Sequence, residues 1–158
     1  MGDEIQHGEI TDGRGASAAV IPDDVRAVLE SGRLAHVTTL NRDGSPQVSC
    51  VWVGVDDDEI VIASLPRNRK VQNLERDPRV VLSMETGRKG HGGLDEYLVV
   101  HGRARVVAGG APEMLQRLAY VYMGPGVRFP RMDNPPPGYL IRIQPLRYSG
   151  HGPWARSG

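Results

Sequence analysis

A short cationic segment carries the clearest chemical signal in this sequence. Arg67, Arg69 and Lys70 fall within four positions, directly after an alternating apolar segment and at the start of a short amphipathic one. Amide N–H groups at the start of a helix, together with the positive end of its dipole, favour an anion. Arginine and lysine side chains add further phosphate donors. The pattern predicts a site for a phosphorylated small molecule, and the alternative interpretation is a solvated basic turn.

The elements around this segment would hold its cations at a junction between a strand and a helix. Residues 59–64 alternate as a strand and end at Ser64. Asn68 is a suitable N-cap for a helix over residues 69–76. Asp77-Pro78 stops that helix, because the residue before proline avoids the helical region.

Familiar catalytic motifs are missing from the sequence. It contains no Gly-x-Gly-x-x-Gly after a strand, no Walker loop, no nucleophile elbow and no His-Glu-x-x-His. The five histidines are scattered, and His36 and His101, which lie in predicted strands, are either structural or close to a cofactor. These absences favour a protein whose bound cofactor performs the chemistry.

Such a cofactor needs polar groups along its linker and an apolar slot for a flat ring. Ser49 and Ser64 lie on adjoining predicted strands and could bond a ribityl chain, although each is also an ordinary strand residue. Val48 and Trp52 could contact the ring, and Trp52 is explained equally well as a core residue.

Composition limits the classes of partner and the compartment. The 158 residues, with 39% hydrophobic and 24% charged content, fit one soluble domain. Nineteen basic and nineteen acidic residues cancel, so no overall charge draws the chain to nucleic acid or membrane. Cys50 is the only cysteine, which excludes an intrachain disulfide and favours the cytoplasm. No segment reaches the roughly 18 apolar residues of a membrane span.

The periodicity along the chain predicts a mainly β protein. Residues 1–19 are expected to be a disordered leader, and residues 20–158 one domain. Residues 86–93, with four glycines, are expected to form a flexible basic loop. Helices are predicted near residues 22–30, 69–76 and 112–123, and strands over residues 34–40, 47–55, 59–64, 79–84, 97–107, 139–143 and 146–148. Six or seven strands joined by hairpins indicate an antiparallel barrel and not a doubly wound parallel sheet.

The order of several short motifs resembles that of a known superfamily. The matching segments are residues 29–40, 42–49 and 70–80, followed by residues 97–105, 122–126 and 152–154. Together they resemble the pyridoxamine 5′-phosphate oxidase-like split-barrel superfamily, which binds flavin or deazaflavin. Within it, the chain is similar to the branch described as dependent on coenzyme F420.

The resemblance implies a six-stranded antiparallel split β-barrel that forms a homodimer, with two cofactor sites at the interface. Lys70 matches the lysine that contacts the cofactor phosphate, and residues 67–69 (Arg67, Asn68 and Arg69) match its loop. Gln47, Val48 and Ser49 match the strand along the ring and the ribityl chain. Trp154 resembles a C-terminal aromatic residue that lies near the ring in the partner subunit.

The resemblance therefore implies an F420-dependent oxidoreductase that transfers hydride between the reduced cofactor and an unsaturated organic substrate. Two alternatives stay open: an FMN-dependent oxidoreductase of the same fold, and a non-catalytic flavin- or deazaflavin-binding protein. No side chain is assigned as proton donor, and His36, Tyr97 and His101 are candidates only. The basic loop 87–91 would either meet the acidic tail of the deazaflavin or be solvated.

Overall fold

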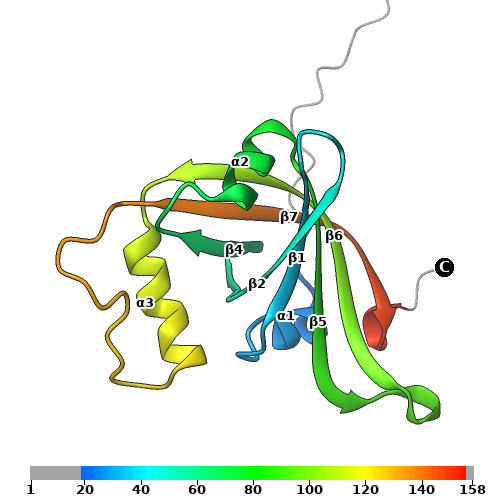
Figure 1. Ribbon diagram of the computed structural model, residues 1–158. Helices are drawn as coiled ribbons and strands as arrows, with labels where there is room; N and C mark the ends of the chain where they lie inside the picture. Colours follow the sequence, from blue (N-terminus) through cyan, green and yellow to red (C-terminus); the bar gives the residue numbers. More distant parts are fainter. Residues whose placement is uncertain (1–18, 156–158) are drawn as a thin grey trace, which may run out of the picture.

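Alternating apolar residues build one curled antiparallel sheet of seven strands (Figure 1). The structure is a computed structural model that describes residues 19–155, so the expected leader lies almost wholly outside it. The sheet order is β2-β1-β5-β6-β7-β4-β3. The strands are β1 (Ala35–Leu40), β2 (Pro46–Val51), β3 (Gly54–Asp56), β4 (Glu59–Ser64), β5 (Arg79–Lys89), β6 (Asp95–Ala108) and β7 (Tyr139–His151).

This architecture confirms the predicted split barrel, with seven strands in place of the six that the resemblance implied. Compared with the seven strands predicted from periodicity, the segment over 47–55 is two strands, β2 and β3, and the segments over 139–143 and 146–148 are one, β7. The chain leaves the sheet between β2 and β3, where the amide of Val53 donates to the hydroxyl oxygen of Tyr122 at 3.1 Å. In the described part of the chain, β2 and β3 are thus the two edges of the sheet and are not paired with each other.

The long strands β6 and β7 bend across the barrel at a bulge. Their register shifts between His101 and Gly102, and Gly102 lies opposite Pro145. A Cβ atom on Gly102 would lie 2.7 Å from the carbonyl oxygen of Gln144, so only glycine permits this close approach. The two segments predicted over 139–143 and 146–148 are consequently one continuous strand.

The core lies inside the curl of the sheet. In β1, for example, Ala35, Val37 and Thr39 are buried while the residues between them are partly or fully exposed, as expected where side chains alternate across a strand. The largest fully buried aliphatic side chains come from several strands and from residues 21–29; they include Ile21, Leu29, Ile60, Ile62, Leu82, Leu98, Ile141 and Ile143.

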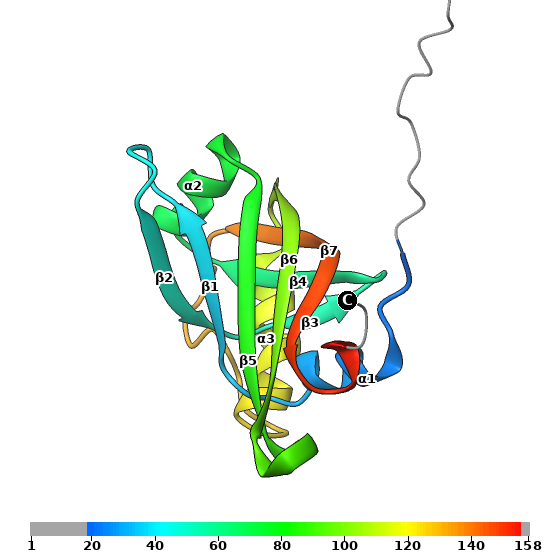
Figure 2. The same ribbon diagram turned by 90° about the vertical axis from the view of Figure 1, so that its right-hand side faces the viewer.

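Three α-helices cover different parts of the barrel. They are α1 (Asp23–Leu29), α2 (Arg69–Arg76) and α3 (Ala111–Tyr122), and two 3-10 turns, η1 (His91–Gly93) and η2 (Pro153–Ala155), complete the fold. Figures 1 and 2 show α2 and α1 toward opposite ends of the barrel, with α3 alongside β4. Among the described residues, no helix is long and apolar enough to cross a membrane.

The prediction of a flexible loop over residues 86–93 is wrong. β5 continues to Lys89 and β6 begins at Asp95, so this part of the chain is a hairpin arm with a 3-10 turn at its tip (Figure 1). Opposite charges across the two strands stabilise the arm: Arg88 pairs with the buried Glu96, and Lys89 pairs with Asp95. Its two strand cations are therefore already matched by carboxylates.

Candidate functional site

Lys70 lies at a pocket of about 260 Å³ whose wall is otherwise almost entirely apolar. Five parts of the chain form this Lys70 pocket: the residue before β1, the end of β2 with the residue after it, β4, α2, and α3 with the segment after it. The lining residues are Leu34, Cys50, Val51, Trp52, Ala63, Lys70, Leu115, Leu118 and Phe129. An apolar slot with one convergent charge is typical of sites that bind a flat organic molecule with one anionic end.

The charge of Lys70 lacks a counterion in the described chain. Its side chain is half-buried, and burial alone lowers the pKa of its ammonium group below the ordinary value. Within residues 19–155, no carboxylate lies within 4.0 Å of this ammonium group. A cation held in this way is stabilised by any anion that enters the pocket.

The loop before Lys70 is held by its own side chains. Asn68 caps α2, its Oδ1 accepting from the amide of Val71 at 3.3 Å, as the sequence predicted. The Nδ2 group of Asn68 donates to Ser64 Oγ at 2.9 Å, and Ser64 Oγ donates to the carbonyl oxygen of Pro66 at 2.8 Å. Asn68 and the buried Ser64 thus fix the point where β4 turns into α2.

The other two cations of the segment have different surroundings from Lys70. Arg67 forms a two-point ion pair with Glu75, and this pairing raises the pKa of Arg67 and lowers the pKa of Glu75. Arg69 is exposed. In the turn between β1 and β2, hydrogen bonds from Ser45 lower the pKa of the Asp43 carboxyl group, and the charge of Arg69 makes a smaller contribution in the same direction. Only Lys70 of the three lines the apolar pocket.

The three predicted residues of β2 face different ways. Gln47 turns to the inside, where its Oε1 accepts from Thr39 Oγ1 at 3.2 Å, and Val48 points outward with 58% of its surface exposed. Ser49 Oγ is buried and has no hydrogen-bond partner among the described residues. The strand reaches the Lys70 pocket through its later residues, beginning at Cys50.

One wall of the pocket is an aromatic cluster that the sequence did not reveal. Trp52 stacks on Tyr122 with ring centroids 5.2 Å apart, and Phe129 lies against Trp52 at 5.1 Å with a tilted ring. Tyr122 is fixed in turn by a hydrogen bond from its hydroxyl group to the carbonyl oxygen of Arg33 at 2.8 Å. Trp52 was a candidate ring contact, but nothing in the sequence joined it to Phe129.

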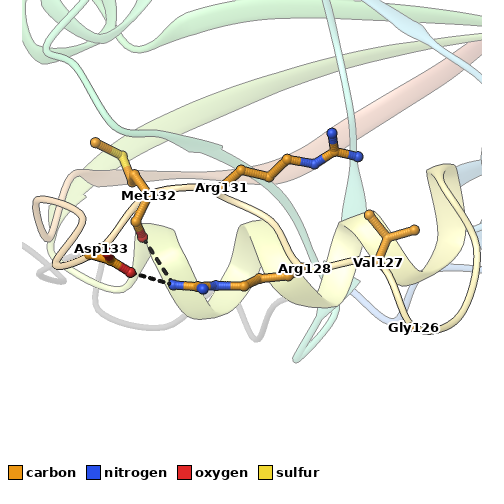
Figure 3. Close-up of a pocket in the computed structure, with 6 residues that line it drawn as sticks. All are labelled: Gly126, Val127, Arg128, Arg131, Met132 and Asp133. Carbon is orange, nitrogen blue, oxygen red and sulfur yellow. Dashed lines mark hydrogen bonds and ion pairs between the residues drawn. The ribbon is translucent and has the colours of Figure 1, made fainter.

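The loop that carries Phe129 is fastened to α3 on both sides of Arg128. Gln116 donates from Nε2 to the carbonyl oxygen of Val127 at 2.8 Å and accepts from the amide of Phe129 at 3.0 Å. Arg128 reaches across the loop to Asp133 at 3.1 Å (Figure 3). A second hollow, of about 580 Å³, is lined by this loop alone. The hydrogen bonds to Gln116 therefore fix the position of Phe129 at the pocket.

The remaining predicted residues lie away from the Lys70 pocket of their own chain. Trp154 is 8% exposed, packs in the core near α1, and donates from its indole Nε1 to the carbonyl oxygen of Tyr97 at 3.1 Å. His36, Tyr97 and His101 alternate with buried residues of β1 and β6 and so point to the outer face of the sheet. His101 lies 3.4 Å from Ser149 Oγ, and burial followed by the charge of Arg147 lowers its pKa.

Comparison with known proteins agrees with this fold. No curated protein gives a significant match. An F420 reductase of known structure has 23% sequence identity and a TM-score of 0.64, and the match covers 82% of this chain and 98% of that one. A conserved hypothetical protein from Mycobacterium tuberculosis has 26% identity and a TM-score of 0.64, with 85% and 87% covered. HupZ from Group A Streptococcus has 19% identity and a TM-score of 0.60, with 88% and 100% covered.

The family assignment comes from the sequence itself. The family described as pyridoxamine 5′-phosphate oxidase matches residues 21–152, a range that contains every strand of the barrel and the Lys70 pocket. This chain belongs to the pyridoxamine 5′-phosphate oxidase family.

Proposed function

We propose that this protein is an F420-dependent oxidoreductase that holds its deazaflavin at the Lys70 pocket and exchanges hydride with an unsaturated organic substrate. The observation that carries the proposal is Lys70 itself, a half-buried ammonium group without a carboxylate partner in the described chain, at the edge of an apolar pocket. The F420 reductase among the structural neighbours supports the choice of cofactor.

The phosphate of the cofactor would lie between Lys70 and the start of α2. The N–H groups of Arg69 and Lys70 belong to the first turn of the helix, where no intrahelical acceptor exists. An anion there gains these donors, the helix dipole and the ammonium charge of Lys70 together. Arg67 would contribute less, because Glu75 already matches its charge.

The rest of the pocket fits the uncharged part of such a cofactor. Trp52, Phe129 and Leu118 offer flat and apolar contacts. Ser49, whose buried hydroxyl group has no partner among the described residues, is next to Cys50 in β2 but does not line the pocket, so it would reach the polar linker only if its side chain moved. When bound, the cofactor ring supplies the hydride chemistry. The protein side chains bind and orient the ring and exclude water from it.

A homodimer with its cofactor sites at the interface is part of the proposal. The volume of about 260 Å³ in one chain is below the roughly 300–1,000 Å³ of complete small-molecule sites, which favours a second chain closing the pocket. Val48 and Leu34, 58% and 53% exposed beside it, would be covered by that chain. Light scattering is expected to give twice the 17.2 kDa of one chain. A monomer that binds cofactor with full affinity would contradict the shared site.

Two alternatives share the same anchor. An FMN-dependent oxidoreductase would use Lys70 in the same way. A non-catalytic cofactor-binding protein is favoured by one observation: among the described residues that line the pocket, only Lys70 and Cys50 carry an ionisable group. Tight binding of F420 without turnover of any of a broad panel of unsaturated acceptors would select this last alternative.

The decisive experiment is a side-by-side titration of the protein with F420 and FMN, followed by absorbance and fluorescence. The preferred ligand is expected to be F420. Lys70→Ala should weaken its binding by roughly 1.5–3 kcal/mol, about 10- to 150-fold, the scale of a charge-assisted hydrogen bond. Arg105→Ala is the matched control, because it removes one exposed cation that lies outside the pocket. Equal affinity in Lys70→Ala and wild type, with the fold intact, would refute the anchor.

A further inference from the structure

We propose that Asn73 is a positioning residue that fixes the rotation of α2 about its axis and thereby directs Lys70 into its pocket. The identity of the bound ligand rests on the proposed function, whereas the orientation of Lys70 does not. Asn73 lies on the buried side of α2 with 1% of its surface exposed, and it takes no part in the Lys70 pocket.

The side-chain amide of Asn73 bonds three different partners. Its Nδ2 group donates to Thr39 Oγ1 at 3.0 Å, in strand β1, and to Asn41 Oδ1 at 3.0 Å, in the turn that follows. Its Oδ1 accepts from the guanidinium group of Arg76 at 3.0 Å, one turn further along α2. The network continues from Thr39, which is fully buried, to Gln47 in β2.

A buried amide is not needed for packing alone. Val71 and Leu74 already anchor the apolar side of α2 in the core, and apolar contacts tolerate small sliding and rolling movements because they have no preferred direction. Hydrogen bonds are directional, and an unsatisfied amide at a buried position is costly. The bonds from Asn73 to β1 and to the following turn therefore select one rotation of the helix among those that the apolar side chains allow.

The rotation of α2 matters for Lys70 because of their spacing. Lys70 and Asn73 are three positions apart, so they are neighbours on the surface of the helix. A side-chain tip lies roughly 5–6 Å from the axis, so a roll of about 20° would move it by about 2 Å, enough to break a hydrogen bond. A helix of eight residues has little stability of its own, so its orientation is set by such anchors.

The test compares Asn73→Leu, which has a similar size but no amide, with Val28→Ala on α1 toward the other end of the barrel. Each is titrated with F420 and with its phosphate-free deazaflavin core, and in parallel with FMN and riboflavin. Asn73→Leu is expected to lose at least tenfold in affinity for the phosphorylated ligand and less than twofold for its phosphate-free counterpart. Val28→Ala, which also loses stability, should leave the ratio of the two affinities as in wild type. A ratio in Asn73→Leu equal to that of the control would overturn the proposal.

A second readout needs no ligand. NMR titration of the Lys70 ammonium group in the unliganded protein should give a pKa that moves toward that of a solvated lysine in Asn73→Leu and stays low in Val28→Ala. If Lys70→Ala leaves phosphate recognition intact, the proposed function fails and this titration still decides the role of Asn73. An unchanged Lys70 pKa would then refute that role.

If Asn73→Leu does not fold, Thr39→Val takes its place, because it removes one acceptor of the same amide. It is expected to change the affinity ratio and the Lys70 pKa in the same directions, by a smaller amount. No change in either would refute the role.

Discussion

Two hydrogen bonds join the guanidinium group of Arg67 to the carboxylate of Glu75, from Nε to Oε1 at 3.0 Å and from Nη2 to Oε2 at 2.8 Å. The pair connects the loop before α2 with the last turns of the helix. Gln72 strengthens the connection, because its Nε2 donates to the carbonyl oxygen of Arg67 at 2.8 Å. Of the three cations in this segment, Arg67 is thus neutralised by an ion pair, whereas Lys70 has no carboxylate partner among residues 19–155.

This difference predicts unequal effects of removing the two cations. Arg67→Ala should weaken binding of the phosphorylated cofactor only about twofold to fivefold, since an exposed and already paired charge contributes little. Lys70→Ala should cost far more. Glu75→Gln should tighten binding modestly by releasing Arg67 from its partner. Isothermal titration of the three variants tests this order, and a larger loss in Arg67→Ala than in Lys70→Ala would reverse the assignment.

Cofactor affinity should fall as the pH rises through the alkaline range. Burial lowers the pKa of Lys70 in the free protein, and a bound phosphate would raise it again, because it stabilises the charged form. Binding therefore takes up a proton between the two pKa values, and affinity decreases with pH from the free-protein pKa upward. Lys70→Arg keeps its charge in this range and should show no such decrease. A parallel pH profile in both proteins would count against Lys70 as the titrating group.

Cys50 should report whether the pocket is occupied. It is the only cysteine of the chain, is exposed, and lines the pocket together with Lys70. Bound cofactor is expected to slow its modification by a thiol reagent in proportion to occupancy, with a midpoint equal to the dissociation constant. Lys70→Ala should require a correspondingly higher cofactor concentration for the same protection. If Cys50 is modified at the same rate with and without saturating cofactor, the cofactor binds elsewhere.

The two hydrogen bonds of Gln116 should affect binding of the cofactor ring and not binding of its phosphate. Gln116→Ala removes both hydrogen bonds that hold the loop around Phe129 and should weaken binding a few-fold. The loss should be equal for FMN and riboflavin, because Phe129 contacts the uncharged part of the pocket. A loss confined to FMN would show instead that the loop acts on the phosphate.

An ion-pair network on β3, β4 and β7 is expected to stabilise the fold. Arg142, whose side chain is 12% exposed, bonds Asp56 at 3.1 Å and Glu59 at 2.9 Å. Arg142→Ala should lower the free energy of unfolding by about 2 kcal/mol, because Glu59 and Asp56 lose their least exposed partner and keep only the more exposed Arg105 and Arg117. Arg105 bonds the same oxygen of Glu59 but is 59% exposed, so Arg105→Ala should cost about 1 kcal/mol or less. Urea unfolding of both variants measures the difference, and equal losses would contradict it.

Short-range patterns in the sequence predicted much of the scaffold. Alternation located most strands, and the N-cap at Asn68 together with Asp77-Pro78 predicted the helix that now extends over Arg69–Arg76. These features depend on residues a few positions apart. The hairpin arm was missed for the same reason, because its glycines suggested a loop while the strand pairing comes from cross-strand partners such as Lys89 and Asp95.

Only one side of the candidate site, formed by residues close together in the sequence, was predicted. Lys70 and its loop follow from neighbouring residues, whereas the wall that faces them comes from Leu118 and Phe129, far along the chain. No periodicity links these side chains to Trp52; only the path of α3 beside β4 brings them together. The ion pair between Arg67 and Glu75 likewise depends on how the loop folds back on α2, and the number of charged residues in the sequence does not show this.

The break between β2 and β3 gives this barrel a seam, and the Lys70 pocket lies beside it. In the described chain, no backbone ladder joins these two edge strands, and their short connection is held by the hydroxyl group of Tyr122. Elsewhere around the barrel, any widening would have to break rows of cooperative backbone hydrogen bonds. At the seam it has to move only side chains. The pocket thus lies where side chains, and not a backbone ladder, close the barrel wall, so widening it along this line would break no hydrogen bond between strands of the sheet.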